Sequence, residues 1–382
     1  MKPRAGSKAL IREINEVLVL NVVRSQGPVA RAAIAAHTGL SPATVTGITS
    51  RMLNAGLLTE ADVVRGAAGR PARLVELSTD RLVAAGVRLS GSEVFVALVN
   101  LRGEVVASHK EPLSSPSPED AGAAITRAVR AATARHREAA LIGVGVAVSG
   151  VVDHEGGLVL HSGSLGWENL PFRDQLTARL DSPVVIDSYV NCLASGLLLF
   201  DGRLSGRDLL VFSVGVSLGA SVVVQGRIHR GFNGAAGGFA HSRVGSGAER
   251  PCHCGAADCL EAWSSHWGIR RELEARDEAD AAGRTEAETE VLASATDRLG
   301  AAMANAAKLF GPESVVAAFT GEMDRPSLTT ATARAFHAQY DHEKAPAPQL
   351  EILSADETDL SRGAAYTVLA QLFTAEIPRP AS

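Results

Sequence analysis

The chain has 382 residues, of which 46% are hydrophobic and 21% are charged, so it can form two or three domains with full cores. No apolar run reaches the length that spans a bilayer, and charged residues interrupt the start of the chain before a secretory signal could form. These features exclude a membrane protein. With only four cysteines they also exclude a disulfide-stapled secreted protein, so we expect a cytoplasmic location.

The charge is unevenly distributed along the chain. The net charge is −5, but residues 1–80 contain ten Lys and Arg against six Asp and Glu, which leaves +4 on this segment and −9 on the rest. A small basic segment on an acidic body favours contact with a polyanion such as DNA. Scattered surface charge would give the same totals, so the sequence pattern has to decide.

The first eighty residues have the pattern of a helix-turn-helix. Apolar residues at spacings of three and four predict a helix over 8–24, and a short helix is expected over 29–37. Gly39 follows as a stop signal, and Ser41 is a suitable N-cap for a further helix over 42–54. A plain three-helix packing unit would share this pattern, so the segment that follows is needed to distinguish it from a DNA-binding domain.

Residues 57–61 and 72–77 are expected to form two short strands around a glycine-rich loop, which makes residues 1–80 a winged DNA-binding domain. The second helix of a helix-turn-helix enters the major groove with its N-terminal half, and an arginine on a wing tip suits the minor groove. Short hydroxyls and arginines can contact bases and phosphates there. The predicted DNA-binding residues are Arg31, Ser41, Thr44, Thr46, Arg51, Gly69, Arg70 and Pro71.

Beyond residue 80, groups of apolar strands alternate with helices twice, over 81–200 and over 201–382. Such alternation predicts an α/β body of two related lobes with a cleft between them.

Three of the four cysteines, Cys252, Cys254 and Cys259, lie within eight residues. Three thiols so close cannot all pair, so a disulfide framework is a poor interpretation. Three soft ligands that need a fourth indicate a metal site, with reduced buried cysteines as the alternative.

The cysteine segment "CHCGAADCLE" (252–261) resembles the CxCGxxGCxE signature of the ROK family of repressors and sugar kinases. Residues 145–176 resemble the sugar-lobe segment of this family, and the winged head followed by "GRP" resembles its repressor branch. The resemblance covers about Leu10 to Phe373. It implies a two-lobed actin-like ATPase (ribonuclease H-like) body preceded by a winged helix-turn-helix domain, with a C-terminal helix that returns to the first lobe.

The resemblance also implies a structural zinc ion (Zn2+) and an effector site. The zinc ligands would be His241 with the three cysteines, a closed set with no position for a catalytic water. His241 would also face a sugar, Glu261 would bind its hydroxyls, and Ser188 stands where an asparagine usually contacts it. Gly238 replaces the glutamate of the family's ExGH motif, so the effector either differs from a simple hexose or does not exist.

The catalytic-base position of the family's kinases falls on Tyr189 in "PVVIDSYVNCLA" (183–194). A phenol with a pKa of about 10 is protonated at neutral pH and is a poor general base. Two residues apart on a strand share a face, so a shifted alignment would make Asp187 the base instead.

The phosphate-binding turns of a kinase are also altered. Arg88 replaces the aspartate of the DxGxT motif, and Val216 and Ser217 interrupt the glycines of the second turn. Ala318 and Phe319 stand at the position of a late Gly-Gly pair. Glycines let the backbone approach a phosphate closely, so these changes indicate that the ATP site is lost.

The sequence therefore predicts a DNA-binding transcriptional regulator, chiefly a repressor of carbohydrate-related genes, without kinase activity. Its partners would be double-stranded operator DNA, a sugar or sugar-derived effector and further copies of the chain, as a dimer or tetramer. The alternatives are a sugar kinase with a fused DNA-binding head and a regulator whose pocket binds no ligand.

Overall fold

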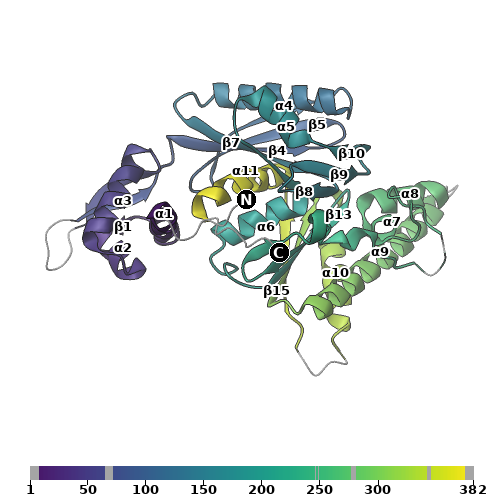
Figure 1. Cartoon of the computed structure of the whole chain (residues 1–382). Helices are drawn as coiled ribbons and strands as arrows, with labels where there is room; N and C mark the ends of the chain where they lie inside the picture. Colours follow the sequence, from purple (N-terminus) through teal and green to yellow (C-terminus); the bar gives the residue numbers. More distant parts are fainter. Residues whose placement is uncertain are drawn as a thin grey trace.

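The structure, a computed structural model, describes residues 8–64, 72–245, 247, 249–276, 281–341 and 346–374. It has three parts: a head formed by the described residues of 8–77, and two α/β lobes (Figure 1). Helices α6 (Tyr189–Phe200) and α11 (Glu357–Phe373) lie in the middle of the molecule, and the head lies to one side of them (Figure 1).

The head is a helix-turn-helix with a small sheet in the order β1-β3-β2. Its elements are α1 (Lys8–Gln26), β1 (Val29–Ala30), α2 (Arg31–Thr38), α3 (Pro42–Asn54), β2 (Leu58–Val64) and β3 (Ala72–Leu77). Gly39 ends α2 with a φ of 71°, and the Ser41 hydroxyl caps α3 by accepting a hydrogen bond from the Thr44 backbone N–H at 3.1 Å. The predicted helices and wing strands are confirmed. Helix α2 starts two residues later than expected because Val29 and Ala30 pair with β3.

The predicted wing tip, Gly69, Arg70 and Pro71, lies outside the described residues.

The first lobe contains a five-stranded sheet in the order β11-β7-β4-β5-β6. Its strands are β4 (Leu82–Leu89), β5 (Glu93–Asn100), β6 (Val105–Pro112), β7 (Ala140–Val148) and β11 (Val184–Ser188). The first three form an antiparallel meander, and β7 pairs in parallel with both β4 and β11. A smaller sheet of β8 (Val151–Asp153), β9 (Leu158–Ser162) and β10 (Trp167–Leu170) is attached to this lobe.

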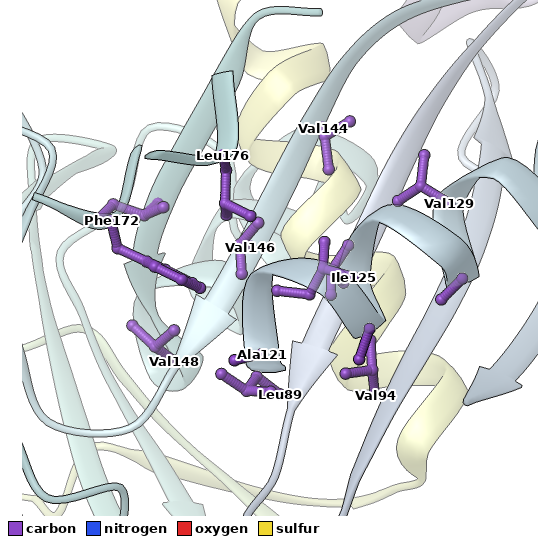
Figure 2. Close-up of a cluster of buried hydrophobic side chains, with 14 of the residues drawn as sticks. Leu89, Val94, Ala121, Ile125, Val129, Val144, Val146, Val148, Phe172 and Leu176 are labelled. Carbon is purple, nitrogen blue, oxygen red and sulfur yellow. The ribbon is translucent and has the colours of Figure 1, made fainter. Parts of the chain in front are cut away.

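One face of this sheet is covered by α4 (Pro118–Ala134) and α5 (Phe172–Leu180). In Figure 2, Ile125 and Val129 of α4 and Phe172 of α5 lie on the same side of the sheet as Val144 and Val146 of β7. All these side chains are buried. Helix α4 buries a full apolar face, because its alanines and β-branched residues recur at helical spacing.

The second lobe repeats this arrangement with the strand order β14-β13-β12-β15-β16. Its strands are β12 (Leu209–Val214), β13 (Leu218–Val224), β14 (Arg227–His229), β15 (Ser314–Thr320) and β16 (Gln349–Ala355). Again three strands form a meander and two more join in parallel beside the first of them. The common strand order confirms the prediction of two related lobes in an α/β body.

Helices cover both faces of the second sheet. The helices and 3-10 turns of this lobe are η1 (Phe232–Gly234), η2 (Gly238–His241), α7 (Leu260–Ser264), α8 (His266–Arg276), α9 (Ala281–Phe310), η3 (Gly321–Met323) and α10 (Pro326–Ala338). Leu299 and Met303 of α9 and Phe336 of α10 pack against one face, and α6 packs against the other. None of the described helices is long and apolar enough to cross a membrane.

Helix α11 connects all three parts. It packs against β4, β5 and β7 of the first lobe and against α6, and it approaches β4 so closely that a Cβ at Gly86 would lie 1.8 Å from the Ser361 carbonyl oxygen. At its C-terminal end, the Phe373 carbonyl accepts a hydrogen bond of 2.7 Å from the Asn21 side chain of α1. The apolar core of the head continues into this contact, so head and body share one cluster of buried side chains.

Candidate functional site

The exposed face of α3 carries the short polar side chains that the sequence singled out. Val45, Ile48 and Met52 are buried against the head, whereas Thr44 and Thr46 are exposed. The Thr44 hydroxyl lies 2.8 Å from the Ser41 hydroxyl, and Thr46 donates to the Pro42 carbonyl at 2.8 Å. The N-terminal half of α3 therefore presents small hydroxyl-bearing side chains and leaves room for a partner to approach.

The two arginines predicted to contact phosphates are held by ion pairs at the surface of the head. Arg51 donates to the Glu16 carboxylate at 2.7 and 3.1 Å. Arg31 donates to the Thr49 hydroxyl at 3.1 Å and to the Glu60 carboxylate at 3.2 Å. Both arginines are thus oriented by carboxylates at the surface of the head, Arg51 on α3 itself and Arg31 in contact with it.

The sequence did not identify the other residues that share these two ion pairs. Glu16 also accepts from Arg12 at 3.1 Å, and Glu60 also accepts from Arg73 at 2.6 Å. Hydrogen bonds from the arginines lower the pKa of Glu60; they also lower that of Glu16, although its partial burial acts in the opposite direction. The four-residue spacing of Arg12 and Glu16 on a helix was a usable signal, whereas the pairing of Glu60 depends on the fold of the wing.

A groove with a volume of about 400 Å³ lies between α1 and the exposed side of α3. It is lined by Lys8, Ile11, Arg12, Asn15, Ala43, Thr44, Gly47, Ile48 and Arg51. Its basic side chains give this side of the head the character of an anion-binding surface.

The predicted metal ligands come together in the second lobe. Their ligand atoms in His241, Cys252, Cys254 and Cys259 all lie within 4.8 Å of one another. His241 Nδ1 is 3.7 Å from the Cys252 Sγ, and the Sγ atoms of Cys254 and Cys259 are 3.6 Å apart. One imidazole and three thiols at this separation fit a four-coordinate metal such as zinc.

The pKa values of the three thiols shift in different directions: burial raises that of Cys252, whereas hydrogen bonds with the Ala256 backbone and the neighbouring thiols lower that of Cys254 although burial opposes them. Burial, with the neighbouring thiols, raises the pKa of Cys259, which is fully buried. A thiol in such a position forms the thiolate that binds a metal only when the metal ion stabilises it.

Glu261 follows the cysteines on α7 and is 1% exposed. Its Oε2 accepts a hydrogen bond of 2.8 Å from the Leu218 backbone N–H, and its Oε1 is buried without a hydrogen-bond partner. Burial raises the pKa of Glu261 to about 8, so the group is mostly protonated at neutral pH. A buried oxygen without a partner is costly, which is consistent with a polar group of a ligand completing it.

The third residue predicted to contact an effector, Ser188, lies in the first lobe. It ends β11 and caps α6 by accepting a hydrogen bond of 3.4 Å from the Asn191 backbone N–H. Among the hydrogen bonds of the described residues, none joins Ser188 to His241 or Glu261.

Tyr189, at the predicted position of the kinase base, is the first residue of α6. Its hydroxyl donates to the Leu89 backbone carbonyl, and burial raises its pKa to about 12. The expectation that Asp187 and Tyr189 share one face of a strand is wrong, because β11 ends at Ser188 and the helix begins at the next residue.

Asp187 is 1% exposed, and its carboxylate is fully occupied. Its Oδ2 accepts from Arg230 at 2.7 and 3.0 Å and lies 3.2 Å from His154 Nδ1, while its Oδ1 accepts from the Asn191 side chain at 2.8 Å. Burial alone would raise the pKa of Asp187, but these contacts lower it. Since Arg230 follows β14, this network joins the two lobes. The sequence did not predict it.

Bulky and charged side chains occupy the positions predicted for the phosphate turns. Arg88 forms an ion pair with Glu357 at the start of α11. Val216, between β12 and β13, is 64% exposed. Ala318 and Phe319, at the position expected for the late Gly-Gly pair, are fully buried inside β15, which ends at Thr320.

Comparison with known proteins agrees with this geometry. Residues 84–371 match the ROK family. A xylose repressor of Caldicellulosiruptor bescii is 26% identical over 369 residues, which are 88% of this chain and 91% of that protein.

Two solved structures share the fold. One is a ROK family transcriptional regulator described as a homologue of the Escherichia coli MLC protein, with a TM-score of 0.77 and 23% identity, covering 96% of this chain and 98% of that one. The other is a ROK family glucokinase from Streptomyces griseus in complex with glucose and AMPPNP, with a TM-score of 0.65 and 23% identity, covering 74% of this chain and 98% of that one. Because the family match extends over three quarters of its length and both lobes, the chain belongs to the ROK family.

Proposed function

We propose that this protein is a DNA-binding transcriptional regulator, a repressor of carbohydrate-related genes. The observation that carries the proposal is the exposed N-terminal half of α3, with Thr44 and Thr46 beside basic side chains and a two-stranded wing. The likeness to a xylose repressor over nearly the whole chain supports the same function. In this proposal the head spans residues 1–80 and the lobes span 81–200 and 201–382.

The DNA partner is a double-stranded operator, and the protein binds it as a homodimer or larger homo-oligomer. The proposed contacts are Arg31, Ser41, Thr44, Thr46, Arg51, Gly69, Arg70 and Pro71. One winged head offers few base contacts, so two heads on an inverted repeat supply the specificity that a single head lacks.

The body binds a sugar or sugar derivative through His241, Glu261 and Ser188. The unpartnered buried Oε1 of Glu261 supports a polar ligand at this position. Since Ser188 belongs to the first lobe and the other two residues to the second, a ligand that contacts all three would favour one angle between the lobes.

A structural zinc ion is held by His241, Cys252, Cys254 and Cys259. The closeness of the four ligand atoms supports this assignment. With all four positions taken by these side chains, the ion would brace the segment that carries His241 and Glu261 and would supply no reactive group.

The protein does not transfer phosphoryl groups. The phenol of Tyr189, with a pKa of about 12, cannot take a proton from a sugar hydroxyl, and Asp187 is held by Arg230 and His154. Arg88 and Glu357 neutralise each other where a kinase needs an acidic residue near its metal. Incubation with ATP and a panel of hexoses and N-acetylhexosamines should release no ADP above the protein-free control. Sugar-dependent turnover that Asp187→Ala abolishes would establish the kinase alternative.

The DNA-binding function is tested by fluorescence anisotropy with the full chain and a labelled duplex from the region upstream of its own coding sequence. We expect binding that weakens as salt increases, and a loss of discrimination against a scrambled duplex in Thr46→Ala. Thr177→Ala is the matched control, because Thr177 is also an exposed helical threonine that donates to the carbonyl four residues before it. Equal effects of the two substitutions, or no binding by the unchanged protein, would contradict the proposal.

A further inference from the structure

Two clusters of the same composition lie on the head, each with one glutamate between two arginines. In the first, Glu16 is 3.1 Å from Arg12 and 2.7 Å from Arg51. In the second, Glu60 is 3.2 Å from Arg31 and 2.6 Å from Arg73. We call these the Glu16 triad (Arg12, Glu16 and Arg51) and the Glu60 triad (Arg31, Glu60 and Arg73). Each has a formal charge of +1.

The two triads border opposite edges of the exposed face of α3. Arg51 belongs to α3 itself, and the Glu60 triad contacts α3 through the bond from Arg31 to the Thr49 hydroxyl. Residues two positions apart on an α-helix are rotated by about 200° around its axis. The side chains of Arg51 and Thr49 therefore point to nearly opposite sides of α3. The exposed residues Thr46 and Ser50 lie between them.

The fold of the wing places the Glu60 triad on the helix side of the small sheet. Glu60 pairs with Val75 across the strands, and Val75 is fully buried against the helices. Side chains alternate along a strand, so Arg73 is on the same face as Val75, while Glu76 is on the opposite face with its own partner, Arg102. Arg102 and Glu76 therefore form an ion pair of the same chemistry that does not face α3.

The arginines remain available to a partner although they are paired. The side chains of Arg12 and Arg73 are 62% and 70% exposed, and those of Arg51 and Arg31 are 44% and 26% exposed. A guanidinium has five N–H donors in a planar fork, so an arginine that bonds one carboxylate oxygen can still bind a phosphate.

We propose that the Glu16 and Glu60 triads are two phosphate-binding sites that hold the two DNA backbones at the edges of the major groove entered by α3. This inference rests on the proposed DNA-binding function. It adds Arg12 and Arg73 to the DNA contacts, and it gives the glutamates a role. Each glutamate holds two arginines side by side and, by its charge, limits the affinity of the head for DNA of any sequence.

The experiment measures the affinity of the full chain for the upstream duplex and for a scrambled duplex over a series of salt concentrations. Arg12→Ala and Arg73→Ala should each weaken binding to both duplexes equally, by about tenfold, and lower the slope of log K against log salt by about 0.9, the value for one lost phosphate contact. Arg102→Ala is the control and should change neither quantity.

The glutamates are tested by Glu16→Gln and Glu60→Gln, which keep the side-chain size and remove one negative charge. Each should tighten binding to both duplexes by several-fold, because two unneutralised arginines then face the phosphates. Circular dichroism and thermal unfolding confirm that each variant is folded.

The outcomes separate this inference from the proposed function. If the unchanged protein binds DNA in a salt-dependent way but Arg12→Ala and Arg73→Ala behave like Arg102→Ala, the triads are not phosphate sites. Weaker binding by the glutamine variants would overturn the role given to the glutamates. If the unchanged protein binds neither duplex, the proposed function itself is wrong.

Discussion

At the scale of the residue, Asp187, two positions before the predicted site of a kinase base, shows how a buried carboxylate can serve structure instead. Its carboxylate accepts hydrogen bonds from Arg230 and Asn191 and lies beside His154, so it joins the two lobes and has no free lone pair directed at a substrate. Replacement of one partner would leave the other charge buried and unpaired, which costs several kcal/mol in comparable networks.

Asp187→Asn is therefore expected to lower the free energy of unfolding by about 3 kcal/mol at pH 7. The pKa of Asp187 is lower in the folded chain than in the unfolded one. The contribution of the Asp187 carboxylate to the free energy of unfolding is therefore complete above the ordinary aspartate pKa of about 4. This contribution is lost as the pH falls through the lower pKa of the folded chain. Urea unfolding between pH 7 and pH 3 should show the difference between the two proteins shrinking in acid.

The control for this comparison is Asp174→Asn, since Asp174 is 71% exposed and contacts only its neighbour Arg173 among the ion pairs of the described residues. It should shift the free energy of unfolding little at any of these pH values. A pH-independent difference between Asp187→Asn and the unchanged protein would contradict the role of the carboxylate.

The sequence predicted which residues stand at the kinase positions, but not their partners. Arg230 lies 43 positions from Asp187, and Glu357 lies 269 positions from Arg88. Contacts over such separations depend on how the lobes meet, and no local spacing encodes them. The cluster of His241 with Cys252, Cys254 and Cys259 was predictable because three of its four members are close in the sequence.

At the scale of the element, capping residues and glycines in the sequence predicted where the helices of the head begin and end. Ser41 and Gly39 fixed the ends of α3 and α2 as expected. The same chemistry explains the error at Tyr189, because Ser188 acts as an N-cap and starts α6 directly after β11. A strand pattern followed by a serine is compatible with a strand that continues through Tyr189 and with a helix that starts there. Only the helix agrees with the packing of α6 between the lobes.

Gly47 lies in the middle of α3, where alanine is favoured over glycine by about 1 kcal/mol. A Cβ at this position would meet only the Arg51 guanidinium, at 3.7 Å, so Gly47→Ala should raise the stability of the head by up to this amount. Because Gly47 lies on the groove side of α3, we expect the same variant to bind DNA more weakly. Thermal unfolding and anisotropy measure the two effects. Gly202→Ala, at an open position outside the head, should leave the DNA affinity unchanged.

The segment between η2 and α7 should depend on its metal. Protein purified without chelator is expected to contain about one zinc ion per chain, and Cys254→Ser should lose the metal and unfold at a lower temperature. Cys192→Ala removes the only other cysteine of the chain and should keep the zinc. Elemental analysis by mass spectrometry gives the zinc content. Stoichiometric zinc in Cys254→Ser, or none in the unchanged protein, would contradict the assignment of the ligands.

At the scale of the whole molecule, α11 is the element through which the lobes can influence the head. It begins at Glu357 beside Arg88, crosses the first sheet and ends at Phe373, where Asn21 of α1 contacts it. A change in the angle between the lobes that moves α11 would therefore reach the head directly through packed side chains.

Phe373→Ala tests this connection. Phe373 is 4% exposed and lies in the cluster that joins head and body, so its truncation should cost about 3 kcal/mol and separate the unfolding of the head from that of the lobes. Differential scanning calorimetry should then show two transitions where the unchanged protein shows one. Phe232→Ala, at an 86% exposed position, should leave the single transition in place. One unshifted transition in Phe373→Ala would mean that the contact does not couple the parts.

Sequence-specific recognition of DNA by paired heads is tested most directly by selection from a library of random duplexes with the full chain. The expected result is enrichment of an inverted repeat whose half-sites are about one helical turn, or a multiple of it, apart. Recovery of duplexes with no common sequence after repeated rounds would contradict it.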